Sequence, residues 1–267
     1  MIKIIEVQRR SNLMEQMENE VLKQIRERKS VRVFLDRPVE KEEKDKIIDA
    51  AMQAPTAGNQ QMYTILDITD PGLKQELSVL CDNQPFIAKA PLVLVFLADC
   101  RKWMDIYRAA DMDPRPAGYG DLILALADTC IAAQNSVTAA WSMGIGSCYI
   151  GDVLENCEKM REALKLPQYV LPAAMVVYGY PTEQQKNRRK PARFERDYIV
   201  QENTYHDNTR EIHQKAIEKR AENDGRRDFD FDYWVKAFGM RKYESDFSRE
   251  MSRSAEVYMQ DYKTKDR

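Results

Sequence analysis

The residues with the clearest chemical potential form one short basic run, Arg28-Lys29-Ser30-Val31-Arg32. In an extended segment alternate side chains lie on the same side, so Arg28, Ser30 and Arg32 would point to one spot. Guanidinium groups keep their charge and match phosphate oxygens with paired N–H donors. The run therefore indicates an anion clamp for a phosphate. A solvated basic turn is the alternative, because short basic runs are frequent and weakly specific.

Helices must hold this run in place. Apolar residues at helical spacing predict a helix over Met14–Glu27, which leads into the run. Val31–Phe34 is expected to be extended, and Pro38 keeps the residue before it out of the helical region. A second helix is expected over Glu40–Ala54, because acidic residues cluster at its start, where the helix dipole favours negative charge.

Two later loops are rich in small and polar residues. Ala54–Gln61 contains Gly58, which permits close approach or a positive φ. This loop either lines a polar heterocycle or simply turns the chain. Gly144–Asp152 contains three glycines, so its backbone N–H groups can donate to a ligand without any side chain. The alternative is that these glycines only allow the chain to turn.

The rest of the body alternates strands and helices. Strands are expected over Met62–Ile68, Pro91–Ala98 and Pro172–Gly179, and the last two are apolar throughout, as in strands covered on both faces. Asp121–Met143 is the longest predicted helix. It is apolar on nearly all sides and should be central, and its polar interruptions argue against a membrane span. Arg101–Gly120 is expected to form a helix and then a mobile excursion over a pocket.

Composition excludes several classes of protein. The 267-residue chain has a formal net charge of -2, which gives no general attraction to nucleic acid or to an anionic membrane. Its start lacks the apolar region of a signal peptide, and its five scattered cysteines suit a reducing cytoplasm. His206 and His213 lack the ligand set of a zinc site. We therefore expect a cytoplasmic protein without metal, nucleic-acid or membrane partners.

Basic residues gather again in Glu183–Arg196, which could reach a phosphate or remain a solvated charged loop. Residues 200–267 are polar and mostly helical by pattern, with several aromatic residues as anchors. We expect a C-terminal arm that packs on the body or on a second subunit.

Taken in order, these stretches resemble the nitroreductase family of flavoproteins, and within it the oxygen-insensitive NADPH nitroreductases and NADPH–flavin oxidoreductases. The resemblance rests on the basic run, on Ala54–Gln61, on Asp128–Tyr149 with the following Ile150-Gly151, and on Leu164–Pro181. It covers residues 22–205 and, more loosely, the remainder of the chain. The basic run alone is a weak motif, whereas the ordered set is specific.

The resemblance implies an α+β fold, with a mixed, mainly antiparallel sheet flanked by helices, in an intertwined homodimer. One FMN per subunit would lie at the dimer interface. We expect an N-terminal extension over residues 1–20, an FMN-binding domain over 21–205 and a C-terminal helical arm over 206–267.

The family positions also imply which residues bind which ligand. The phosphate clamp for FMN would comprise Arg28, Lys29, Ser30, Val31 and Arg32, with the basic pair Lys190 and Arg193 near the phosphate. The loop that lines the flavin would be formed by Thr56, Gly58 and Gln60. Gln84 would contact the flavin, and Tyr149, Ile150 and Gly151 would form the segment over the ring. Arg226 and Arg227 would read the 2′-phosphate of NADPH.

The implied activity is that of an NAD(P)H-dependent FMN oxidoreductase with a ping-pong cycle. No catalytic side chain is expected, because the flavin carries the chemistry and the protein orients it. Acceptors would be nitroaromatics, quinones, azo dyes or free flavin. The alternatives are a flavin reductase supplying reduced free FMN, a non-catalytic flavin-binding sensor, or a structural scaffold. Asp152 departs from the family pattern, which can have a second Gly there, and a carboxylate would disfavour anionic substrates.

Overall fold

The computed structural model describes residues 19–263. They form two compact units, one made of residues 19–187 with 253–263 and the other of Arg188–Ser252. These bounds differ from the expected ones, because the end of the chain belongs to the first unit. Most of the expected N-terminal extension, and the start of the helix expected over Met14–Glu27, lie outside the described residues.

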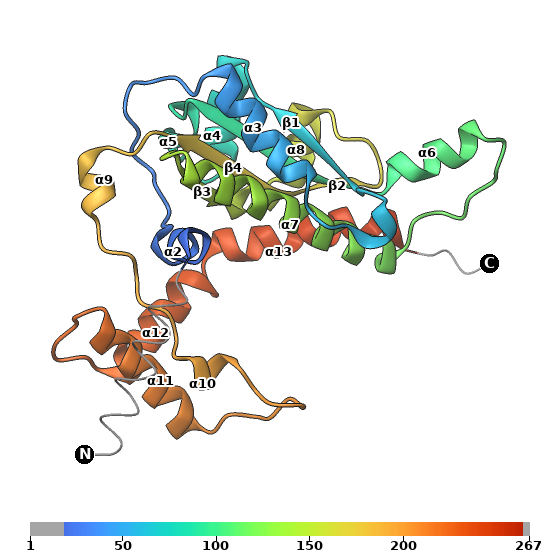
Figure 1. Ribbon diagram of the computed structural model, residues 1–267. Coiled ribbons are helices and arrows are strands. Elements are labelled where there is room, and N and C mark those ends of the chain that lie inside the picture. Colours follow the sequence, from blue (N-terminus) through green and yellow to red (C-terminus); the bar gives the residue numbers. More distant parts are fainter. Residues whose placement is uncertain (1–18, 264–267) are drawn as a thin grey trace. The chain divides into compact units, whose positions relative to one another are not determined.

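The first unit is built on a four-stranded antiparallel sheet with the strand order β1-β2-β4-β3 (Figure 1). The strands are β1 (Tyr63–Asp67), β2 (Leu92–Asp99), β3 (Gly146–Ile150) and β4 (Val170–Gly179). A single parallel bridge joins Ser30 to Ser147 on the β3 edge. The expected α+β class, with helices flanking a mainly antiparallel sheet, is confirmed.

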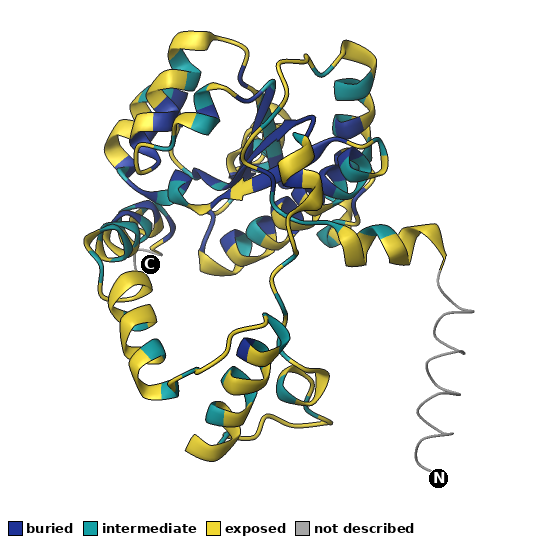
Figure 2. Ribbon diagram, turned by 90° about the vertical axis from the view of Figure 1, so that its left-hand side faces the viewer, coloured by how far each residue is buried: buried dark blue, intermediate teal, exposed yellow. Residues whose placement is uncertain are grey.

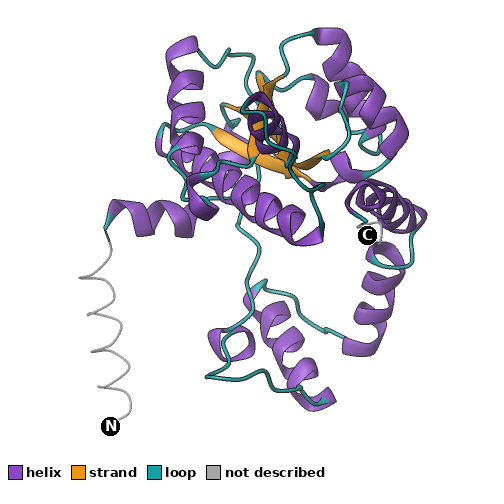
Figure 3. Ribbon diagram, turned by 90° about the vertical axis from the view of Figure 1, so that its right-hand side faces the viewer, coloured by secondary structure: helices purple, strands orange, loops and turns teal. Residues whose placement is uncertain are grey.

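Helices cover both faces of the sheet (Figure 3). Successive side chains of a strand point to opposite faces. Leu92, Leu94 and Phe96 of β2 accordingly join one apolar cluster with α3 (Lys41–Met52) and α7 (Tyr119–Ser142). The intervening Val93, Val95 and Leu97 join a second cluster with α4 (Pro71–Leu80), α5 (Pro85–Ala88) and α8 (Cys157–Leu164). The sheet is therefore the buried layer between two helical layers (Figure 2).

Helix α7 is the helix predicted to be central. Among the described residues it is long and apolar enough, by length and composition, to cross a membrane. Core helices share that composition, and α7 packs Ala132, Val137 and Ala140 into the core beside the sheet. It is not buried on all sides, however, because Ile123 is 65% exposed and Leu124 48% exposed. A second apolar surface therefore remains open on this helix.

Shorter elements connect these layers. In the first unit they are α2 (Glu20–Glu27), η1 (Ala57–Asn59), α6 (Arg101–Ala109), η2 (Gly151–Leu154), α9 (Glu183–Asn187) and η3 (Gln260–Tyr262). Helix α13 (Asp246–Met259) begins in the second unit and ends in the first.

The second unit contains α10 (Arg196–Ile199), α11 (Arg210–Asn223) and α12 (Phe231–Lys242). Phe229, Trp234 and Phe238 pack in sequence, with ring centroids 5.6 and 4.9 Å apart. The helices and aromatic anchors expected in this part of the chain are therefore present, around a small core.

Two glycines allow the segment after α2 to lie against the sheet. A Cβ at Gly146 of β3 would lie 2.6 Å from Val31 Cγ2, and one at Gly179 of β4 would lie 2.7 Å from the Phe34 ring. Val31 is fully buried there, and its backbone N–H donates to the Ser147 carbonyl at 2.9 Å. Only glycine permits this approach, so β3 and β4 fix the path of the basic run.

Replacing Gly146 with alanine should disturb this contact selectively. We expect Gly146→Ala to lower the free energy of unfolding by about 1–3 kcal/mol, because the added methyl group overlaps Val31. Urea denaturation measures the change. Gly120→Ala in α7 is the control, since a Cβ there meets no atom within 4 Å and should leave stability unchanged or slightly raised. Equal stability of the two variants would contradict the tight contact.

Candidate functional site

The basic run begins where α2 ends. Arg28 is the C-cap of α2, and its backbone N–H donates to Gln24 O at 2.9 Å. The chain then runs extended along β3, held by the Ser30–Ser147 bridge. Val31 faces the core. Because alternate residues of an extended chain point to opposite sides, Arg28, Ser30 and Arg32 take the other side together.

The basic run lies beside the buried thiol of Cys148. Burial raises the pKa of Cys148, and Arg32, Ser30 and Arg28 all oppose that rise. Ser30 and Arg32 lie within hydrogen-bonding reach of the thiol, whereas Arg28 acts on it only through its charge. Ser30 and Arg32 thus share the side of the segment that faces Cys148, whereas the convergence of all three side chains and a role in phosphate binding stay predictions. Sequence reasoning missed Cys148, because only the fold brings β3 under the run.

Lys29 and Arg32 also contact α9. Lys29 Nζ donates to the Lys186 carbonyl oxygen, so this ammonium group is held on the α9 side. The backbone N–H of Arg32 donates to Gln185 Oε1 at 3.4 Å, and Gln185 is buried. Helix α9 thus supports the outer side of the clamp, a role that the sequence did not reveal.

The segment Tyr149–Gly151 continues from the clamp. The Tyr149 hydroxyl donates to Gln134 Oε1 of α7 at 3.5 Å. Partial burial raises the pKa of Tyr149, and the charge of Arg28 opposes that rise, which places Tyr149 near the clamp. Ile150 is buried, whereas Gly151 is exposed and has open space where a Cβ would lie. A flat ligand can therefore approach the backbone at Gly151.

Gln84 lies at the same end of β3. Its Nε2 donates to Asp152 Oδ2 at 2.6 Å and to the Cys81 carbonyl at 2.9 Å. Its backbone N–H donates to Ser78 O at 2.9 Å, so both main chain and side chain are fixed. The structure therefore brings together the clamp, Tyr149–Gly151 and Gln84 around one strand and its first turn.

The flavin loop expected at Thr56–Gln60 is a tight turn. Gly58 and Asn59 have φ values of 59° and 56°, so Gly58 takes the positive φ, one of the two possibilities that the sequence left open. The Ala57 N–H donates to Asp128 Oδ1 of α7 at 2.9 Å, and Trp103 Nε1 of α6 donates to the Gln60 carbonyl at 2.7 Å. Long-range partners thus fix both halves of the loop, and short-range sequence patterns do not show them.

Asp128 is an unusual support, because only 3% of its surface is exposed. Its Oδ2 and the Tyr63 hydroxyl have no hydrogen-bond partner within residues 19–263. Burial raises the pKa of Tyr63, and the nearby Asp128 raises it further. Buried polar atoms without partners are costly, so the bond to Ala57 is the main compensation for burying this carboxyl group.

This loop and the clamp lie on different edges of the sheet. The loop leads into β1, whereas the clamp lies on β3, and these are the two outer strands. Three strand spacings amount to about 14 Å. Figure 1 likewise draws the loop near the start of α7 and the clamp beside α2. One chain therefore does not bring Thr56, Gly58 and Gln60 against Arg28, Ser30 and Arg32.

A cavity of about 180 Å³ lies beside the loop. Gln60, Trp103, Tyr107 and Arg115 are among its lining residues, and α6 with the segment after it provides most of the wall. The pocket expected beneath Arg101–Gly120 is therefore present.

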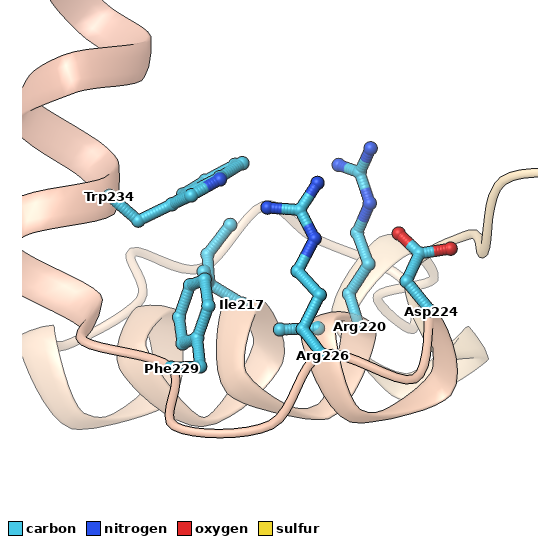
Figure 4. A pocket seen from close by; sticks show the side chains of 7 residues that line it. Ile217, Arg220, Asp224, Arg226, Phe229 and Trp234 are labelled. Carbon is cyan, nitrogen blue, oxygen red and sulfur yellow. The ribbon is translucent and has the colours of Figure 1, made fainter.

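The remaining predicted residues belong to the second unit. Arg226 lies with its guanidinium carbon 5.6 Å from the Trp234 ring centroid, in a small pocket with Arg220, Asp224 and Phe229 (Figure 4). The loop carrying Lys190 and Arg193 is tied to this pocket, because Ala192 N–H donates to Asp224 Oδ1 at 2.7 Å. For Lys190, Arg193, Arg226 and Arg227, a position against the clamp stays a prediction.

Metal ligands do not gather in the part of the chain that the structure describes, where no group of three or more His, Cys, Asp or Glu side chains could hold an ion. His213 instead contacts Tyr198, with Nδ1 2.8 Å from the hydroxyl.

Comparison with known proteins decides the family. Residues 25–180 match the model of the nitroreductase family. The chain belongs to this family. It is 34% identical over 193 residues to an FMN reductase (NADPH) of Bacillus subtilis, covering 72% of this chain and 76% of the relative. It is also 34% identical over 178 residues to the oxygen-insensitive NADPH nitroreductase of Salmonella typhimurium. That match covers 66% of this chain and 71% of the relative.

Solved structures agree with this assignment. The NfrA1 nitroreductase of B. subtilis superposes with a TM-score of 0.72 at 30% identity, covering 87% of this chain and 98% of that one. The structure of NfrA2 of B. megaterium superposes with a TM-score of 0.76 at 26% identity, covering 90% of this chain and 98% of that one. The family resemblance expected from the motifs is confirmed.

Asp128 offers a direct test of the loop support. Asp128→Ala should free the Ala57 amide, so hydrogen exchange within residues 55–61 should quicken and stability should fall by about 1–3 kcal/mol. Asp128→Asn is the matched control, because its carbonyl oxygen can still accept from Ala57. Exchange that is unchanged in the alanine variant would show that other contacts hold the loop.

Proposed function

We propose that this nitroreductase is an NAD(P)H-dependent FMN oxidoreductase that reduces nitroaromatics, quinones or related acceptors in a ping-pong order. The observation that carries the proposal is that the basic run lies along β3 beside Cys148, on the strand that leads to the open backbone of Gly151. When bound, FMN supplies the redox chemistry, and the protein holds and orients the reactants. No side chain is required as a nucleophile.

The residues present suit FMN. Two guanidinium groups and a hydroxyl provide the charge and donors that a phosphate monoester needs. The raised pKa of Cys148 keeps the thiol beneath them neutral, so no anion competes for the arginines. The open, exposed backbone at Gly151 leaves room for a flat ring next to a backbone N–H donor. Such a donor can stabilise negative charge that develops on the ring.

We extend the proposal to a homodimer, in which each site takes its clamp from one subunit and its Thr56–Gln60 loop from the other. The separation of these elements on opposite sheet edges supports this arrangement. So does the exposed apolar surface. It includes Ile123, Leu124 and Ile131 of α7 and Val21, Leu22 and Ile25 of α2. Apolar patches of this kind are characteristic of protein interfaces.

For the second unit, we assign Arg226 and Arg227 to the 2′-phosphate of NADPH, and Lys190 and Arg193 to the FMN phosphate. The pocket around Arg226 supports a nucleotide contact, because it combines the cationic groups of Arg220 and Arg226 with the aromatic ring of Trp234. We also propose a cytoplasmic location without nucleic-acid or membrane partners. The five cysteines are all free, which suits a reducing compartment.

An activity as a flavin reductase that supplies reduced free FMN is the second candidate. The name of the B. subtilis relative, an FMN reductase, favours it. Rapid reduction of free FMN with poor turnover of nitroaromatics and quinones would select this alternative.

Anaerobic visible spectra of the purified protein test the proposal. We expect a flavin spectrum that is bleached by NADPH, with NADH less effective if Arg226 and Arg227 read the 2′-phosphate. Oxidised acceptor added afterwards should restore the spectrum. A flavin spectrum that neither nucleotide bleaches would indicate a flavin-binding sensor, and protein that stays colourless after FMN addition and desalting would refute FMN binding.

The clamp gives a separate prediction. Arg32→Ala should weaken FMN binding about 10–150-fold, because a hydrogen bond to a charged group contributes about 1.5–3 kcal/mol. Fluorescence titration of the apoprotein with FMN measures this. Arg37→Ala is the control, since Arg37 stacks on Tyr180, 3.7 Å from the ring centroid, and should leave FMN affinity unchanged. Equal losses in the two variants would indicate a general effect of charge and not a clamp.

A further inference from the structure

We propose that Asp152 sets the charge preference of the acceptor site, so that the enzyme favours neutral or cationic acceptors and rejects carboxylated ones. The inference rests on the proposed function and names its substrate class. Asp152 directly follows Gly151, where the backbone is open to a ligand.

Gln84 fixes the position of the Asp152 carboxylate. The amide Nε2 of Gln84 lies 2.6 Å from Asp152 Oδ2 and 2.9 Å from the Cys81 carbonyl. Both neighbours are pure acceptors, so only the amino end of the amide can face them. Gln84 is itself anchored, because its backbone N–H donates to Ser78 O. The carboxylate is thus tied to the body of the protein and cannot swing freely into solvent.

This arrangement leaves acceptor atoms for a ligand. Both Nε2 hydrogens of Gln84 are used, and within residues 19–263 no group donates to its Oε1 or to Asp152 Oδ1. A second acidic residue, Glu155, adds to the negative charge near Asp152. Asp152 and the buried Glu155 both raise the pKa of the Cys81 thiol, after the larger effect of its burial. The turn after β3 therefore presents negative charge and lone pairs, and no ion pair to Asp152 forms among the described residues 19–263.

The consequence for acceptors follows from electrostatics. An aromatic carboxylate placed over Gly151 would bring a second negative charge close to Asp152, and like charges held near each other are destabilising. A nitro compound or quinone without charge meets no such penalty, and a cationic acceptor gains an attraction. Because Asp152 is partly buried and held by Gln84, bulk water screens it less than a freely exposed side chain.

Asp152→Asn isolates the charge, because asparagine keeps the shape and its carbonyl oxygen can still accept from Gln84. We expect the oxidised holoenzyme of this variant to bind benzoate about tenfold more tightly than wild type, a difference of about 1.4 kcal/mol. Perturbation of the visible flavin spectrum reports that binding without turnover. Affinity for benzyl alcohol, which is neutral, should not change. The ratio of kcat/KM for 4-nitrobenzoate to that for 4-nitrobenzyl alcohol should rise by a similar factor.

Asp82→Asn is the matched control. It removes an exposed carboxylate two residues from Gln84, and asparagine tolerates the φ of 58° at this position. This variant should behave as wild type toward benzoate. Equal benzoate affinities in wild type and Asp152→Asn, or equal gains in both variants, would overturn the inference while leaving the proposed function intact. A holoenzyme that fails to form at all would overturn the proposed function and this inference with it.

Discussion

The contact between Val31 and Gly146 is the constraint on which the rest of the site depends. It presses the segment after α2 against β3, closer than any side chain larger than hydrogen at residue 146 would allow. With Val31 buried and its N–H bonded to Ser147, the alternate residues have to face the opposite side. A hydrophobic contact in the core thus determines the side of the segment on which Arg28, Ser30 and Arg32 lie.

The sequence predicted those parts of the molecule that depend on local patterns. The period of two in the basic run anticipated that Ser30 and Arg32 lie on the side opposite the buried Val31, and the apolar runs anticipated β2 and β4. Gly58 was expected to permit either a close approach or a positive φ, and it adopts the positive φ. The contacts from Cys148, Asp128 and Gln185 were not anticipated, because each joins residues far apart in the chain. Helix α7 was expected to be buried on nearly all sides, yet composition cannot distinguish a core face from an apolar face that remains open.

The two supports of the site differ in kind. The clamp is held mainly by shape, with glycine and valine in close contact and a neutral thiol beneath. The Thr56–Gln60 loop is held by polar atoms: a buried carboxylate accepts from Ala57, and an indole donates to Gln60. Packing fixes position without regard to charge, whereas the loop's supports orient individual N–H and C=O groups. This division suits a phosphate held by charge and a heterocycle recognised by hydrogen bonds.

The location of these supports on opposite edges of the sheet has a genetic consequence in the proposed homodimer. A chain with a defective clamp still carries an intact loop, and a chain with a defective loop still carries an intact clamp. When two such chains pair, one of the two composite sites combines both defects and the other combines neither. Co-expression of two inactive alleles would then recover partial activity through mixed dimers, a form of complementation that a site built within one chain cannot show.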